Sequence, residues 1–126
     1  LGSELVTLGK MIDEQQIEAV TSELTVAETL VKPLKTGDIE LRQKYETIVG
    51  PTSPIALVPV TRSILEAAAG LRATLGGRLP DAIHVATALT TKCSALLTLH
   101  TRIKHPPTVN VLHLSDIASL KVMPAP

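Results

Sequence analysis

The chain has 126 residues, of which 44% are hydrophobic, so it is long enough for one ordinary domain with a proper core. It has no Phe, no Trp and a single Tyr, which excludes stacking of bases on aromatic rings as a main binding mode. Its formal net charge is zero, unlike the basic balance of a bulk polyanion binder. An aliphatic core of this kind is typical of a parallel sheet covered by helices.

Basic and acidic side chains are distributed unevenly along the chain. Residues 1–58 hold five basic and nine acidic side chains, whereas residues 59–126 hold seven basic and three acidic side chains. Contacts with nucleic acid would therefore be local, although a solvating role is the simpler explanation for any single surface charge. The basic candidates are Arg62, Arg72, Arg78, Lys92, Arg102 and Lys104.

The single cysteine, Cys93, excludes an internal disulfide and a cysteine zinc cluster. Its apolar surroundings predict a small buried side chain. No apolar run approaches the roughly 18 residues of a membrane span, so we expect no membrane partner and, by default, a cytoplasmic location.

The first half of the chain begins with apolar residues at helical spacing, which predict a helix that reaches Ile12. Residues 17–21 predict a short strand. The next helix is expected to begin at Thr25, which forms a capping-box pattern with Glu28, and to end at residues 33–37, where Pro33 and Gly37 interrupt the pattern.

Asp38 is expected to cap the following helix. Residues 50–54 then read as a loop, and residues 55–60 predict a second strand. Pro59 favours an edge position for this strand, because proline cannot donate to a strand ladder. The inward face of the helix is predicted to carry Leu41, Tyr45, Ile48 and Val49.

The second half of the chain predicts two helices and two strands. Thr61 is expected to cap a helix that ends at Gly76 and Gly77, and another helix is expected from Leu79 to about Lys92. Strands follow at residues 95–99 and 109–114. The residues expected to point inward from the two helices are Ile64, Leu65, Ala68, Leu71, Leu75, Ile83, Ala86 and Leu89.

This alternation of helices and strands predicts a three-layer α/β/α fold with a mostly parallel sheet and right-handed crossovers. Such sheets bind ligands beyond the carboxyl ends of their strands. Residues 21–28 and 98–101 follow strand ends, so they are the segments where we expect chemistry.

Glu28 and Asp81 are the main candidates for that chemistry, because each lies in the first turn of a predicted helix. Each also has a structural explanation: Glu28 completes a capping box, and Asp81 suits the positive end of a helix dipole. Together, two carboxylates near the mouth of a parallel sheet can share a magnesium ion, which prefers oxygen ligands and keeps several waters. Such an ion can activate water for phosphodiester cleavage.

Two segments around these carboxylates resemble motifs of PIN-domain proteins, particularly the toxin ribonucleases of VapBC-type, or type II, toxin–antitoxin pairs. Residues 21–28, with the sequence TSELTVAE, resemble the second motif of that family, and residues 79–88, LPDAIHVATA, resemble the third and more specific one. Residues 96–98 resemble the strand before the fourth motif, and residues 109–117 the closing strand and turn. The likeness covers nearly the whole chain.

The resemblance implies a sheet of about five parallel strands and an endoribonuclease that depends on Mg²⁺ or Mn²⁺. It implies that Glu28 and Asp81 are catalytic and hold the metal, and that Thr98 is the threonine of the fourth motif. RNA is then the substrate, with Arg78, Arg102 and Lys104 as expected contacts. It also implies an antitoxin protein as partner, and the apolar stripe of the first helix can serve a homodimer or simply face the core.

The chain departs from the family pattern in two places. The family begins with a central strand that ends in an aspartate, and residues 1–126 contain no counterpart, so we expect a single PIN-like domain that is incomplete at its amino end. The alternatives are that another chain supplies the strand or that the sheet closes differently. Where the family has an acid after Thr98, this chain has His100, which can ligate a transition metal such as manganese or contact RNA phosphate.

His84 follows Asp81 by three residues on the same helical face. It can donate to a metal-bound carboxylate, although a histidine near the core is the simpler explanation. A zinc site built from His100, His105 and His113 matches no standard spacing.

Three functions remain open at this point. The first is an active metal-dependent endoribonuclease. The second is a catalytically impaired PIN-like module that keeps its fold for dimerisation or for binding an antitoxin or other partner. The third, a receiver-like signalling domain, lacks the early acidic pair that it needs.

Overall fold

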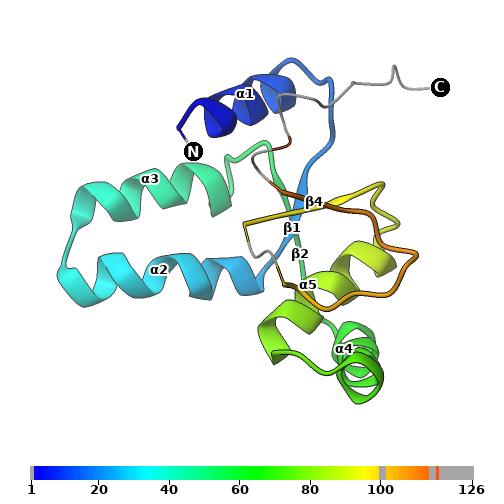
Figure 1. Ribbon diagram of the computed structural model, residues 1–126. Coiled ribbons are helices and arrows are strands. Elements are labelled where there is room, and N and C mark those ends of the chain that lie inside the picture. The colour runs from blue at the N-terminus through cyan, green and yellow to red at the C-terminus, as the bar shows by residue number, and fades with distance from the viewer. Residues whose placement is uncertain (1, 100–101, 114–115, 117–126) are drawn as a thin grey trace.

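The structure is a computed structural model that describes residues 2–99, 102–113 and 116. Figure 1 shows short central strands, with α2 and α3 on one side and α4 and α5 on the other. The elements are α1 (Gly2–Asp13), β1 (Val20–Ser22), α2 (Leu24–Thr36), α3 (Ile39–Val49), β2 (Ala56–Val58), α4 (Arg62–Leu75), α5 (Leu79–Thr90), β3 (Leu96–Thr98) and β4 (Val111–His113).

The strands pair in parallel, which confirms the predicted α/β class. β1 lies beside β2, with Val20 opposite Ala56, and β3 lies beside β4, with Thr98 opposite His113. Within the described residues these two pairs are not joined, so the single sheet predicted from the element order is replaced by two two-stranded sheets. Accordingly, β2, the strand before Pro59, has β1 as its one strand neighbour in the described part of the chain.

Helix α2 differs from the prediction at both ends. It begins at Leu24 after Glu23 as N-cap, so the capping box expected between Thr25 and Glu28 is not formed. It also continues past Pro33, whose buried ring gains packing that offsets the backbone hydrogen bond lost inside the helix. The helix ends at Gly37, which adopts a left-handed conformation (φ 69°) and donates its N–H to the Pro33 carbonyl.

Helix α3 packs against α2 to form a helical hairpin that extends from the strands (Figure 1). Its predicted cap is confirmed, since the Asp38 carboxylate accepts from the Leu41 N–H at 3.0 Å. Val49 is buried as expected, but Ile48, which was predicted to face inward, is 46% exposed. Ile48 lies at the edge of the face that carries Leu41, Tyr45 and Val49, which leaves it open to solvent.

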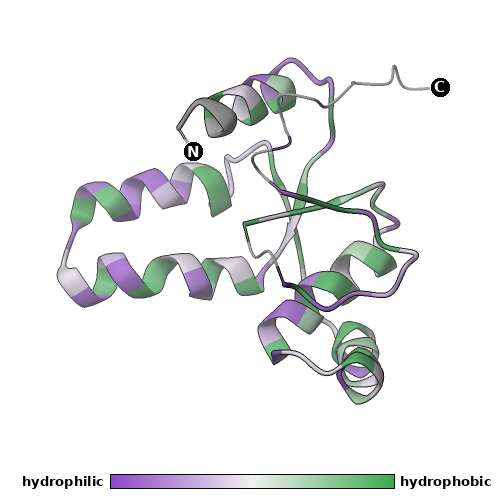
Figure 2. Ribbon diagram, viewed as in Figure 1, coloured by the Kyte–Doolittle hydropathy of each residue, from purple (hydrophilic) through white to green (hydrophobic). Residues whose placement is uncertain are grey.

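The main core lies between α4 and α5. Its buried members are Ile64, Ala68, Ala82, Ile83 and Ala86. The three alanines are small, which allows the two helix backbones to approach closely. Figure 2 shows the hydrophobic residues concentrated on α5 and the strands, whereas α2 and α3 alternate in polarity along their length.

Both ends of α4 follow the sequence signals. The Thr61 side chain accepts from the Ile64 N–H at 3.2 Å, which confirms the cap, and Gly76 and Gly77 take positive φ angles of 76° and 88°. The prediction that Leu65 faces inward is wrong, because it lies beside the core stripe rather than on it and is 46% exposed.

Helix α5 ends at Thr90, two residues before the predicted end at Lys92. Cys93, expected to be buried on this helix, instead lies in the turn that follows and is exposed. Its sulfur lies 3.1 Å from the Thr91 hydroxyl. Leu89, also predicted to point inward, is 38% exposed although it follows the spacing of the buried residues, because it lies at the end of the helix.

Candidate functional site

The candidate site is centred on a contact between α2 and α5. Glu28 Oε1 lies 2.6 Å from His84 Nε2, although the two residues are 56 positions apart in the sequence. The His84 side chain is 24% exposed and the Glu28 side chain is 42% exposed. The pair therefore lies at the molecular surface, where solvent, an ion or a substrate can reach the carboxylate.

The local structure at the start of α2 leaves the Glu28 side chain available for this contact. The Leu24 N–H, the first of the helix, donates to the Ser22 Oγ at 3.1 Å. The Thr25 hydroxyl hydrogen-bonds the Thr21 hydroxyl at 2.7 Å instead of acting as an N-cap. Because Ser22 and Thr21 belong to β1, the carboxyl end of that strand fixes the direction in which α2 and Glu28 leave it.

Asp81 lies in the first turn of α5 and is half-buried. It precedes His84 by three residues, so both side chains project from the same face of α5, one turn apart. The contact between His84 and Glu28 therefore places Glu28 against the helix that bears Asp81. That Glu28 and Asp81 share a metal ion stays a prediction.

Ser22 is a residue whose importance sequence reasoning missed. It is 1% exposed and joins the end of β1 to the start of α2 through its side chain. A serine just before a helix is a signal for such a cap, but Thr25 with Glu28 offered a competing one.

Of the remaining predicted residues, Thr98 lies at the end of β3. It is half-buried and opposite His113 of β4. His100, expected to replace an acid, lies outside the described residues. His105 is half-buried, and its Nδ1 lies 3.0 Å from the Pro106 carbonyl oxygen. The roles of Thr98 and His100 stay predictions.

Basic residues gather at the amino end of α5. Arg78 is the exposed N-cap residue of that helix, and its side chain makes no capping hydrogen bond. The Arg72 guanidinium donates to the Gly77 carbonyl at 3.2 Å. Lys104 packs so closely over Gly77 that an added Cβ there would lie 3.0 Å from its Cγ. Lys104 thus lies beside the residue that precedes Arg78, and Arg78 lies one turn before Asp81. Arg102 is exposed on the segment that leads to Lys104.

The donor chemistry of the site fits magnesium in part. Two carboxylates suit an ion that prefers oxygen ligands and keeps several waters. In the described part of the chain, however, no three His, Cys, Asp or Glu side chains are grouped so that they could hold a metal ion. A tightly bound ion would therefore need ligands beyond Glu28 and Asp81.

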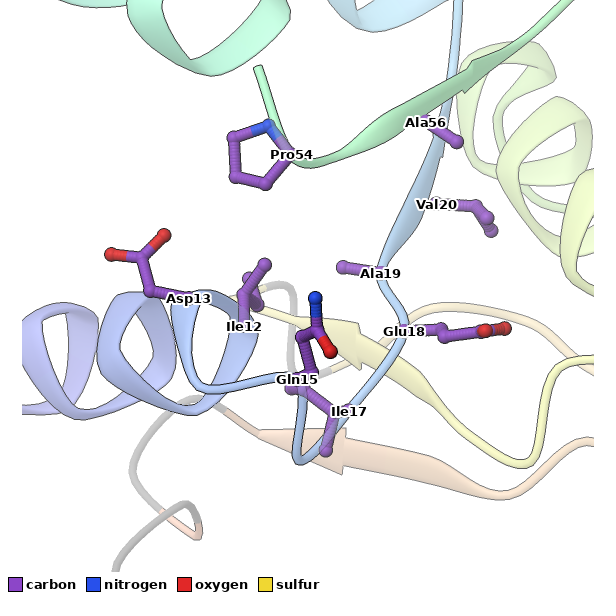
Figure 3. Close-up of a pocket in the computed structure, with 9 residues that line it drawn as sticks. All are labelled: Ile12, Asp13, Gln15, Ile17, Glu18, Ala19, Val20, Pro54 and Ala56. Carbon is purple, nitrogen blue, oxygen red and sulfur yellow. The ribbon is translucent and has the colours of Figure 1, made fainter. Parts of the chain in front are cut away.

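A cleft also lies at the amino end of the β1–β2 pair, away from these residues. It has a volume of about 690 Å³ and is lined mainly by the end of α1, the chain that follows it, and β1. Figure 3 shows Ile12 and Asp13 of α1 on one side of this cleft and Glu18, Ala19 and Val20 on the other. Since Glu28 follows the opposite end of β1, this cleft is separate from the candidate site.

The fold and the site together define a parallel α/β domain with a carboxylate pair on two helices that begin beyond the strands. A family model for the PIN domain matches residues 5–108, and the chain belongs to that nuclease-type family. The chain also resembles a solved toxin–antitoxin complex from Klebsiella pneumoniae, with 24% sequence identity and a TM-score of 0.59. That match covers 74% of this chain and 71% of the other, and it supports the fold.

A search of curated proteins found no match. Among the helices of the described residues, none has the length and apolar character needed to cross a membrane.

Proposed function

We propose that this protein is a metal-dependent endoribonuclease of the toxin–antitoxin type that hydrolyses RNA phosphodiester bonds in the cytoplasm. The observation that carries the proposal is the 2.6 Å contact between Glu28 Oε1 and His84 Nε2, which holds Glu28 beside the helical turn that bears Asp81. Membership of the PIN-domain family supports the same assignment.

Each side chain of the site has a task in this proposal. Glu28 and Asp81 would hold Mg²⁺ or Mn²⁺, which when bound supplies the positive charge that makes a phosphodiester susceptible to attack by water. Arg78 and Lys104 would bind RNA phosphates next to the site, and Arg102 would extend that contact. Thr98 and His100 would lie at the edge of the site nearest β3, as the family resemblance implies.

We also propose that the complete domain has a further strand beside β1, which would add the acid that the described residues lack. The Ala19 carbonyl accepts from Ala56, and the Glu23 N–H donates to Val58, so alternate residues of β1 face β2. The backbone of Val20 therefore points to the other edge, and Val20 is 38% exposed. Slow amide exchange at Val20 in the product of the whole gene, and fast exchange in residues 1–126 alone, would support this strand.

An antitoxin protein is the partner that this proposal requires, because a cell must restrain an enzyme that cleaves its own RNA. The similar structure from Klebsiella pneumoniae is a toxin–antitoxin complex, which supports this partner class. A homodimer is a further expectation, and equilibrium sedimentation of the protein alone would test it.

A second candidate function is a catalytically impaired PIN-like module that binds an antitoxin or another partner. The observation that favours it is the lack, among the described residues, of three acidic, histidine or cysteine side chains grouped for a metal ion. In that case the fold would be kept for its surfaces alone.

Cleavage of RNA by matched variants decides between the two functions. Glu28→Gln and Asp81→Asn keep side-chain shape but remove the charge, so each should reduce Mg²⁺-dependent cleavage by at least 100-fold. Glu66→Gln is the matched control, because Glu66 is 68% exposed on α4, where it pairs with Arg62. Cleavage that survives both site substitutions rejects the nuclease proposal, and a wild-type protein without cleavage favours the binding module.

A further inference from the structure

We propose that His84 is a positioning residue that orients the Glu28 carboxylate for metal binding; this inference rests on the proposed function. A glutamate on a surface helix has three rotatable side-chain bonds and samples many positions. Here one of its oxygens, Oε1, is held 2.6 Å from the His84 ring. This contact also restricts the direction in which the other oxygen, Oε2, points.

The His84 ring is a suitable anchor because α5 is the best-packed helix of the fold. Its neighbours in the sequence, Ile83 and Val85, are 6% and 0% exposed, so the helix cannot shift without disturbing the core. The Thr87 hydroxyl donates to the Ile83 carbonyl at 2.7 Å within the same turn. By contrast, the Glu28 side chain is 42% exposed and has greater freedom to move.

The contact also defines which atoms are used. An ionised carboxylate can only accept hydrogen bonds. The His84 Nε2–H group is therefore the hydrogen-bond donor to Glu28 Oε1, and the ring acts through that N–H. An Nε2 atom that carries this proton has no lone pair for a metal ion. His84 therefore acts on the ion through Glu28 rather than as a ligand itself, which is how histidines and carboxylates outside the ligand set tune metal sites.

Two substitutions separate a positioning role from a ligand role. His84→Ala removes the donor, and we expect Mn²⁺ binding, measured by calorimetry without RNA, to weaken about 10- to 100-fold, the usual cost of losing such a partner. His84→Gln places an amide N–H near the position of Nε2, and we expect Mn²⁺ affinity within a few-fold of the wild type. In a Glu28→Gln background, His84→Ala should cause little additional loss.

The outcomes are distinguishable. Equal Mn²⁺ binding by the wild type and His84→Ala overturns the positioning role and leaves the proposed function intact. A Gln variant as weak as the Ala variant overturns it as well, since an amide can replace the donor but not a ligating imidazole. If His84→Ala fails to fold, the Gln variant and its double variant with Glu28→Gln still decide. Wild-type protein that binds no Mn²⁺ overturns both proposals.

Discussion

Replacement of Glu28 by Gln should have a small effect on the stability of the metal-free protein and a large effect on its response to magnesium. Without metal, the substitution weakens the 2.6 Å contact with His84. Exposed polar pairs contribute about 0.2–1 kcal/mol to folding, and the partly exposed Glu28–His84 pair should contribute within that range. For a chain of this size the melting temperature should fall by about 1–5 °C.

The response to magnesium should be several times larger. A ligand at 100 times its dissociation constant stabilises the native state by about 2.7 kcal/mol, which corresponds to roughly 10 °C here. The proposed ion loses one of its two described carboxylates in Glu28→Gln, so most of that increase should disappear.

Differential scanning calorimetry in EDTA and in a magnesium series measures both quantities. Glu66→Gln is the control, because the Arg62–Glu66 pair has 92% and 68% exposed side chains and should change neither. The reasoning is refuted if Glu28→Gln and the wild type show the same magnesium-induced increase. It is also refuted if the metal-free variant is destabilised by much more than 1 kcal/mol.

Three further predictions concern the core, a helix cap and the basic cluster. Ile64→Ala should reduce the free energy of unfolding by about 2–5 kcal/mol in urea titrations, because Ile64 is 1% exposed, whereas Leu65→Ala should cost less than about 1 kcal/mol; similar losses would contradict the assigned core. Thr61→Ala should lower the free energy of unfolding by about 1 kcal/mol in the same assay, because the α4 cap is lost, and Thr61→Asp should retain most of the stability that the cap provides. Arg78→Gln with Lys104→Gln should weaken RNA binding and reduce the slope of log affinity against log salt by about 1 to 2; an unchanged slope would remove both residues from the RNA contact.

Much of the fold follows from local signals in the sequence. The caps at Asp38 and Thr61 and the stop at Gly76 each depend on a few neighbouring atoms, so residue type alone predicts them. The parallel direction of β1 and β2 follows from the helices between them, whereas no helix of the described residues lies between β3 and β4, which are parallel as well. The inward faces were less well predicted, because Leu65 lies one position away from the buried stripe and Leu89 lies at the exposed end of α5.

The members of the candidate site stay predictions, and only one of their contacts is observed. Glu28 and Asp81 were chosen from the kind of residue and its place near a helix start, and the expected donation by His84 to a carboxylate is seen at Glu28. The start of α2 was misassigned because a capping box at Thr25 and a cap from Ser22 compete locally, and Ser22 formed the bond. The contact between Glu28 and His84 joins residues 56 positions apart, so it depends on how α2 and α5 pack and on no local pattern.

The edge of β1 at Val20 has a practical consequence for concentrated samples. Among the described residues β1 pairs with β2 alone, and an unpaired strand edge is a template on which strands of other molecules can assemble. Concentrated samples should therefore tend to form irregular aggregates, and particle size should increase with protein concentration. A lysine at position 20, whose charge disfavours such stacking, is the substitution that should keep those samples clear.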